Sequence, residues 1–303
     1  MTQEPKSRNI GGGLQALPKD DRDFSFGAIF GLPKLEELPD EYIVGKPIRI
    51  KDQGNTDMCT AYALTAVSED QELVELNPFY TFGKTKQIMG DWESWGADLR
   101  SACKSAVDYG FIPTDGIIKV PDDEDRDKAA NWANWPQESD QQAARHKKRS
   151  YFAVTGQYDT FDNLRATLWQ NRAEERSVLA GCTWRQEWTR ASGGIVPYIY
   201  GNGGFGHAFK IFGWKKILTA YSRVDGGEQF FETYLMAQLS NGTEIGEDGI
   251  FYFPREVVNK EFTFGLFTFK DMPREEAEYL HKKKLAGFVG RILLAISAFF
   301  AKF

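Results

Sequence analysis

The sequence predicts an α+β protein with two lobes and a cleft between them. Two observations support this class. The first half holds Ala- and Leu-rich helical runs, and the second half holds short runs rich in aromatic and β-branched residues, as strands have. Helices gathered in one half and strands in the other are typical of an α+β architecture. With 303 residues, the chain is long enough for a sizeable core.

We expect four segments along the chain. The first carries Gly11-Gly12-Gly13 and several prolines among charges, which predicts an extended arm that wraps the body. A polar stretch over 121–150 marks the boundary between the lobes. The arm, the helical lobe, the β-rich lobe and a basic, apolar C-terminal helix are expected at residues 1–45, 46–150, 151–272 and 273–303.

Each lobe has its own predicted elements. In the helical lobe we expect a short strand at 48–50, a buried helix from Met58 to about Leu76, and a second helix from Ala97 to Tyr109 that Gly110 closes. In the β-rich lobe one helix at 160–171 interrupts the strands. Those strands are expected at 151–155, 177–181, 207–214, 230–239, 250–253 and 262–269.

Composition narrows the class of protein. The formal net charge of −6 argues against nucleic acid as a partner, because a nucleic-acid-binding face is basic. The N-terminus lacks the apolar run of a signal peptide, and three widely spread cysteines do not form a secreted disulfide framework. We therefore expect a cytoplasmic protein. Cys103 and Cys182 are expected in the core, with a disulfide between them as the alternative.

Four residues form a candidate site for nucleophilic catalysis. Cys59 lies at the start of an apolar helix, where the helix dipole and unpaired N–H groups favour a thiolate. His207 follows a glycine-rich segment that lets a thiol and a substrate approach its ring. Gln53 precedes the helix on a turn and is placed to complete an oxyanion hole, and Asn241 is placed to orient the imidazole.

These residues lie in blocks that resemble a known family. Residues 50–54 with 59–63 read Ile-Lys-Asp-Gln-Gly and Cys-Thr-Ala-Tyr-Ala, residues 206–208 read Gly-His-Ala, and residues 241–249 contain Asn-Gly-Thr and Gly-Glu-Asp-Gly. Their order and spacing resemble the papain-like cysteine peptidases, in particular a bacterial branch. The resemblance implies a two-lobe papain-like fold and hydrolysis of peptide or protein substrates through a thioester on Cys59. It implies no cofactor.

The chain departs from the family pattern at two places that bear on activity. Asp57 and Met58 precede the nucleophile where the family has small residues, and the block after Asn241 lacks the aromatic residue that shields the Asn–His bond. These departures motivate one alternative, an inactive binding or structural module with this fold. A further alternative is a transpeptidase or amidase that uses the same dyad.

Gly96 is a candidate contact for the substrate backbone, and its alternative role is at the start of the following helix. With three histidines and no paired ligand spacing, we expect no metal site. Only about 45 residues precede the predicted first strand, too few for a helical pro-domain. We therefore expect an N-terminal arm that packs on the body as part of the mature fold.

The last segment, residues 282–303, begins with three lysines and continues as an apolar run that Arg291 interrupts. On a helix its cations share one face, which is typical of a helix lying in a membrane surface or of a short anchor. Docking on the body or on a partner protein is the alternative. We expect this segment to hold the chain at a membrane or a partner surface.

Overall fold

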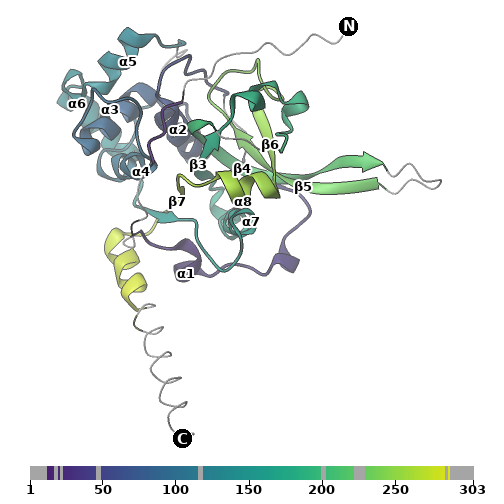
Figure 1. Ribbon diagram of the computed structural model, residues 1–303. Helices are drawn as coiled ribbons and strands as arrows, with labels where there is room; N and C mark the ends of the chain where they lie inside the picture. The colour runs from purple at the N-terminus through teal and green to yellow at the C-terminus, as the bar shows by residue number, and fades with distance from the viewer. Residues whose placement is uncertain are drawn as a thin grey trace, which may run out of the picture.

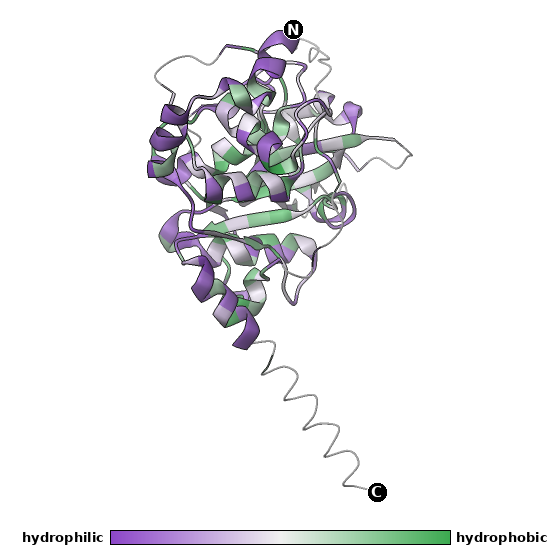
Figure 2. Ribbon diagram, turned by 90° about the vertical axis from the view of Figure 1, so that its left-hand side faces the viewer, coloured by the Kyte–Doolittle hydropathy of each residue, from purple (hydrophilic) through white to green (hydrophobic). Residues whose placement is uncertain are grey.

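The protein is described by a computed structural model over residues 12–16, 20, 23–45, 49–114, 119–198, 203–221, 229–283 and 286. It consists of a helical lobe and a lobe built on an antiparallel sheet, which confirms the predicted α+β class (Figure 1). Figure 2 shows that hydrophobic residues follow the strands, whereas the outer helices are largely hydrophilic. The helices and strands therefore bury their apolar faces against one another.

The sheet runs in the order β2-β7-β3-β4-β5-β6, and β1 also pairs with β4. Its centre is β4, which pairs with β1, β3 and β5 and extends with β5 into the long hairpin that projects in Figure 1. The sheet strands are β1 Tyr42–Ile43, β2 Ser150–Ala153, β3 Val178–Trp184, β4 Phe205–Tyr221, β5 Gln229–Gln238, β6 Ile250–Pro254 and β7 Leu266–Lys270.

Among the described residues, five α-helices form the helical lobe, three lie in the arm and beside the sheet, and one begins at residue 274. The helical lobe holds α2 Cys59–Glu72, α3 Pro78–Met89, α4 Leu99–Asp108, α5 Asp123–Ala130 and α6 Gln137–Ala143. The others are α1 Phe26–Phe30 in the arm, α7 Thr160–Gln170 and α8 Arg255–Glu261. The core of the β-rich lobe lies between the sheet and helices α7 and α8.

Several sequence predictions about these elements were wrong. Helix α2 ends before Leu76, because Leu73 adopts a left-handed conformation (φ 56°) that stops it. Helix α3 was missed, although Asn77 caps it, Pro78 occupies its first turn and Gly90 closes it. In the predicted strand at 48–50, the described residues Arg49 and Ile50 are not in a strand.

Helix α2 crosses the interface between the lobes and carries two buried carboxylates near its end. Asp70 forms a fully buried ion pair with Lys210 of β4 and accepts a hydrogen bond from Ser177. The neighbouring Glu69 pairs with the buried Lys51. Burial raises the pKa of both carboxyl groups above the usual range and lowers the pKa of Lys51. Both lobes are therefore attached to the same helix by buried polar contacts.

The arm and the start of the C-terminal helix pack on the body. Phe26 and Ile29 of α1 share a small core with Phe152 and with Ala277, on the helix that begins at 274. No helix among the described residues is both long and apolar enough to cross a membrane. The expected interfacial segment at 282–303 lies outside the described residues except for 282, 283 and 286.

Removing the Lys210 ammonium tests how strongly the buried pair stabilises the fold. We expect Lys210→Met to lower the free energy of unfolding by about 3–5 kcal/mol, because Asp70 is left as a buried charge without its cation. Urea unfolding followed by tryptophan fluorescence measures the change. The matched control is Lys216→Met on the same strand, whose partner is Asp40 and whose side chain is 41% exposed; it should cost less than about 1 kcal/mol. Equal losses in the two variants would contradict this role.

Candidate active site

Cys59 lies where helix α2 meets strand β4. It is the first residue of the helix, so its own N–H has no acceptor within the helix. The backbone amides of Ala208 and Gly13 lie close enough to its sulfur to favour its ionised form. The side chain is fully buried, and this burial raises the pKa of the thiol to about 11. In this closed arrangement Cys59 is therefore a neutral thiol at neutral pH.

His207 lies on β4, on the β-rich side of the same junction. It pairs with Cys182 of β3 in the strand register and is fully buried. Because Ala208 follows it directly and its amide lies near the Cys59 sulfur, the fold brings the backbone of the predicted base next to the predicted nucleophile. The second and third cysteines, Cys103 and Cys182, are both free and buried, so the alternative disulfide does not form.

The ring of His207 packs against aromatic side chains. The Trp184 ring, on β3, lies 5.5 Å from it between centroids at an interplanar angle of 62°. Trp184 is itself fully buried and packs edge-on against Trp188 and Phe251. An aromatic ring from the neighbouring strand β3 thus contacts the predicted base. Sequence reasoning missed Trp184 because only the pairing of β3 with β4 brings it to the histidine.

Gln53 is held by hydrogen bonds to both ends of its side-chain amide. Its Nε2 donates to the Thr56 carbonyl at 2.8 Å, and its Oε1 accepts from the Ser240 hydroxyl at 2.6 Å. These partners fix the amide orientation, since a flipped amide would place an oxygen against the carbonyl and an NH₂ against the hydroxyl's proton. Gln53 is completely buried just before the start of helix α2.

Asn241 is joined to the same segment. It forms an antiparallel bridge with Asp52, and the flanking backbone bonds run from Gln53 N–H to the Ser240 carbonyl (2.8 Å) and from Gly242 N–H to the Lys51 carbonyl (3.0 Å). Asn241 is fully buried. Gln53, the predicted oxyanion residue, and Asn241, the predicted orienting residue, therefore lie on two paired backbone segments. The position of one segment fixes the position of the other. Their catalytic roles remain predictions.

The N-terminal arm runs through the cleft directly over Cys59. The Leu14 N–H donates to the Gly206 carbonyl (3.1 Å) on one wall, and the Ala97 N–H donates to the Gly13 carbonyl (2.7 Å) on the other. The Gln15 N–H donates to the Ala97 carbonyl (3.0 Å), which completes a parallel bridge. The described part of the predicted arm therefore packs on the body inside the cleft, bonded to both of its walls.

Close approach of the arm depends on glycines. A side chain on Gly13 would meet the Asp57 carbonyl at 2.0 Å, and one on Gly206 would meet the Leu14 carbonyl at 2.1 Å. The Leu14 side chain enters an apolar pocket beside Leu99, Leu179 and Phe267. In the sequence, the Gly11-Gly12-Gly13 run before Leu14 indicates a segment that can approach other backbone closely. This signal was missed.

Gly96 borders the arm but does not pair with it. It has φ 77°, and a Cβ there would lie 1.9 Å from the Gly13 carbonyl oxygen. The neighbouring Ala97 supplies the backbone N–H and carbonyl that the arm uses. Helix α4 starts only at Leu99, with Asp98 as its cap. Ala97, one residue beyond Gly96, is thus the residue whose backbone pairs with the arm, and a substrate contact at Gly96 stays a prediction.

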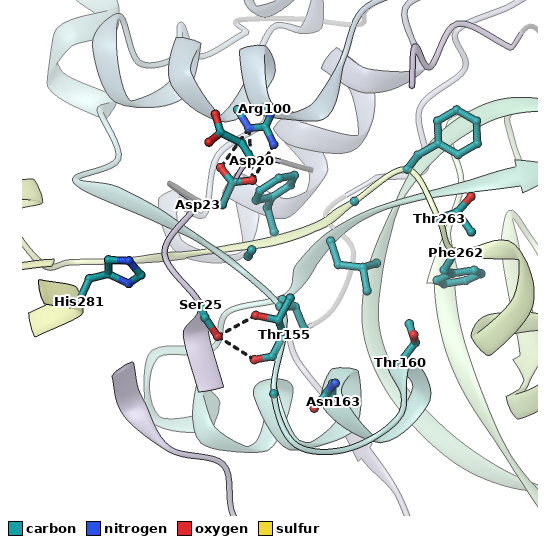
Figure 3. A pocket seen from close by; sticks show the side chains of 17 residues that line it. Asp20, Asp23, Ser25, Arg100, Thr155, Thr160, Asn163, Phe262, Thr263 and His281 are labelled. Atoms are coloured by element: carbon teal, nitrogen blue, oxygen red, sulfur yellow. Dashed lines mark hydrogen bonds and ion pairs between the residues drawn. The ribbon is translucent and has the colours of Figure 1, made fainter. Parts of the chain in front are cut away.

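A separate cavity of about 610 Å³ opens between the arm and the β-rich lobe (Figure 3). Arg100 pairs with Asp23 at one end of it, Ser25 and Thr155 are hydrogen-bonded on its wall, and His281 lies at its edge. Neither Cys59 nor His207 is among its described lining residues.

Known structures with the same arrangement identify the fold. No protein-family model and no curated protein matches the sequence. Xylellain, a cysteine protease from Xylella fastidiosa, matches with a TM-score of 0.64 over 88% of this chain and 98% of its own, at 19% identity. Procathepsin B S9 of Trypanosoma congolense matches with a TM-score of 0.58 over 87% and 86%, at 15% identity. The fold is that of the papain-like cysteine proteases.

A third similar structure agrees with this fold. Digestive procathepsin L 3 from the larval midgut of Tenebrio molitor matches with a TM-score of 0.56 over 86% of this chain and 75% of its own, at 15% identity. The papain-like fold confirms the two-lobe expectation. The shared architecture covers both walls of the cleft, because each match extends over most of the chain.

The raised pKa of Cys59 predicts the protonation state of the closed protein. We expect no Cys59 thiolate near neutral pH, because the thiol of a free cysteine already titrates only at about 8.5 and burial moves this one higher. Ultraviolet thiolate absorbance measured against pH, for the wild type and for Cys59→Ser, should give coincident curves below about pH 9. A thiolate that titrates near neutrality in the wild type alone would show an ionised pair beneath the arm.

Proposed function

We propose that the chain is a cysteine peptidase with Cys59 as nucleophile and His207 as general base. The observation that carries the proposal is the junction of α2 and β4, where the Cys59 sulfur meets the amide of Ala208 next to His207. The structural similarity to cysteine proteases supports the reaction class. A peptide or protein is the expected substrate, since the cleft already accommodates an extended segment of this chain.

The proposed reaction proceeds through a thioester. His207 accepts the thiol proton as the Cys59 sulfur attacks the scissile carbonyl carbon, and the oxygen that becomes negative is held by the Gln53 amide and the Cys59 N–H. His207 then protonates the leaving amine as the C–N bond breaks. Water, deprotonated by His207, hydrolyses the thioester and restores the thiol. Asn241 is the proposed orienting residue for the imidazole.

In this proposal the N-terminal arm inhibits the peptidase activity. Gly13 directs its N–H toward the sulfur and its carbonyl toward Ala97, so the arm does not present its carbonyl carbon for attack. Substrate needs the space that Gly13 and Leu14 occupy. Release of the arm would also admit water to Cys59 and so remove the main cause of its raised pKa. Membership of the bacterial branch is part of the same proposal and rests on the sequence blocks described above.

Labelling with a thiol-reactive epoxide tests the nucleophile. We expect the probe to label Cys59 when the arm opens and a peptide-library digest to yield new amines. We expect both to be lost in Cys59→Ala, because Cys103 lies inside helix α4 and Cys182 inside strand β3, whereas Cys59 lies at a helix start beside the arm. Mass spectrometry locates the label. Equal labelling of Cys59→Ala would assign reactivity to another cysteine. Labelling without new amines would favour the inactive module, and ligated products would favour transpeptidation.

Opening the cleft tests the restraint by the arm. Leu14→Asp places a carboxylate in the apolar pocket, and we expect the arm to detach and the rate of Cys59 labelling to rise by about tenfold or more. The matched control is Leu73→Asp, which adds the same charge at a leucine that is 76% exposed. It should label at the wild-type rate. If both variants label like the wild type, the arm does not limit access.

A further inference from the structure

The segment that receives the arm, residues 94–97, forms the edge of the cleft on the helical lobe. We call it the cleft edge. Besides the Ala97 backbone bonds, its Trp95 indole N–H donates to the Gly12 carbonyl (2.7 Å), and its Trp95 carbonyl accepts from the Gln15 side chain (2.7 Å). This edge is the place where an extended peptide is bound by main-chain hydrogen bonds. Its position relative to Cys59 therefore decides where a peptide lies.

No regular element holds the cleft edge. It lies in the connection between α3 and α4, where the backbone forms turns and bends. Two buried cations bind its carbonyl groups instead. Lys86 of α3 donates to the Ser94 carbonyl (2.8 Å) and the Gly96 carbonyl (3.0 Å), and Arg126 of α5 donates to the Ser94 carbonyl (2.6 Å). Arg126 also reaches the Trp92 carbonyl (3.2 Å) just before the edge.

Asp57 connects these cations to the nucleophile. Its carboxylate accepts from Arg126 Nε (3.0 Å) and Nη2 (2.9 Å), and it also accepts from the Gly96 N–H. Asp57 is fully buried and Arg126 is 5% exposed, so the pair is shielded from water. Such two-point, charge-assisted contacts have a fixed geometry that a lysine does not reproduce. Asp57 lies two residues before Cys59, which gives a short rigid path from the thiol to the cleft edge.

We infer that Arg126 and Asp57 are positioning residues that set the cleft edge at the correct distance from Cys59 for a bound peptide backbone. The inference deepens the proposed peptidase function and rests on it for its kinetic test. It also gives Asp57 a structural role: the acidic residue before the nucleophile anchors the substrate-binding edge, and its negative charge also raises the pKa of the Cys59 thiol. Loosening this anchor weakens peptide binding more than it changes the chemistry at Cys59.

Kinetics in the Leu14→Asp background test the inference. We expect Arg126→Lys to raise KM for a peptide selected from the library digest by about tenfold, with kcat changed less than about threefold, because binding of the peptide backbone is lost in ground and transition states alike. Asp57→Asn should act in the same direction. The matched control is Arg165→Lys, an arginine ion-paired with Asp162 in the other lobe. It should leave KM unchanged. An unchanged KM in Arg126→Lys, or an equal rise in the control, overturns the inference.

Hydrogen exchange tests the anchor without any turnover. In the wild type the Gly96 amide should exchange as slowly as amides of the buried helix α2, although it lies in a loop, and in Arg126→Lys its protection should fall by about tenfold or more. Fast exchange in the wild type, or unchanged protection in the variant, would overturn the anchor. If no variant cleaves peptides but the protection behaves as expected, the proposed peptidase function fails and the anchoring of the edge stands.

Discussion

The buried ion pair between Asp70 and Lys210 ties helix α2 to strand β4, and the candidate site depends on that attachment. Lys210 also donates to the Ala66 carbonyl (3.2 Å), so one strand residue contacts the helix at two points. The helix begins at Cys59 and the strand carries His207 and Ala208. Because both elements are rigid and joined at a buried contact, the start of the helix is held at the histidine. A solvent-exposed contact would not fix this geometry as strongly.

In the proposed peptidase, one segment both stabilises the fold and covers the nucleophile. The arm closes the groove with backbone bonds to both walls and with Leu14 in an apolar pocket, and in doing so it removes water from Cys59. A thiolate needs solvation or a nearby cation, so a buried thiol keeps its proton. In the proposal, access and ionisation are coupled, because release of the arm would admit substrate and water to Cys59 together. Location at a membrane is not required for this kind of control.

The two departures from the papain-like pattern have structural counterparts. Asp57 is engaged by Arg126 and by the cleft edge, which makes it part of the binding wall. An aromatic residue does pack on His207, but it is Trp184 of β3 and not a residue after Asn241. In both cases the contacting residue is distant in sequence and adjacent in space.

The sequence by itself determined the α+β class, the start of helix α2 at Cys59, and the sequence blocks that hold Gln53, His207 and Asn241, because local spacing and turn chemistry are readable along the chain. It also held the signals for α3, in Asn77, Pro78 and Gly90, which were overlooked. Only the tertiary structure decided that Gly13 covers Cys59, that Trp184 packs on His207, and that Ala97, one residue beyond Gly96, presents the backbone. These contacts join segments far apart in the chain, and their partners are selected by packing and burial, which local patterns do not encode.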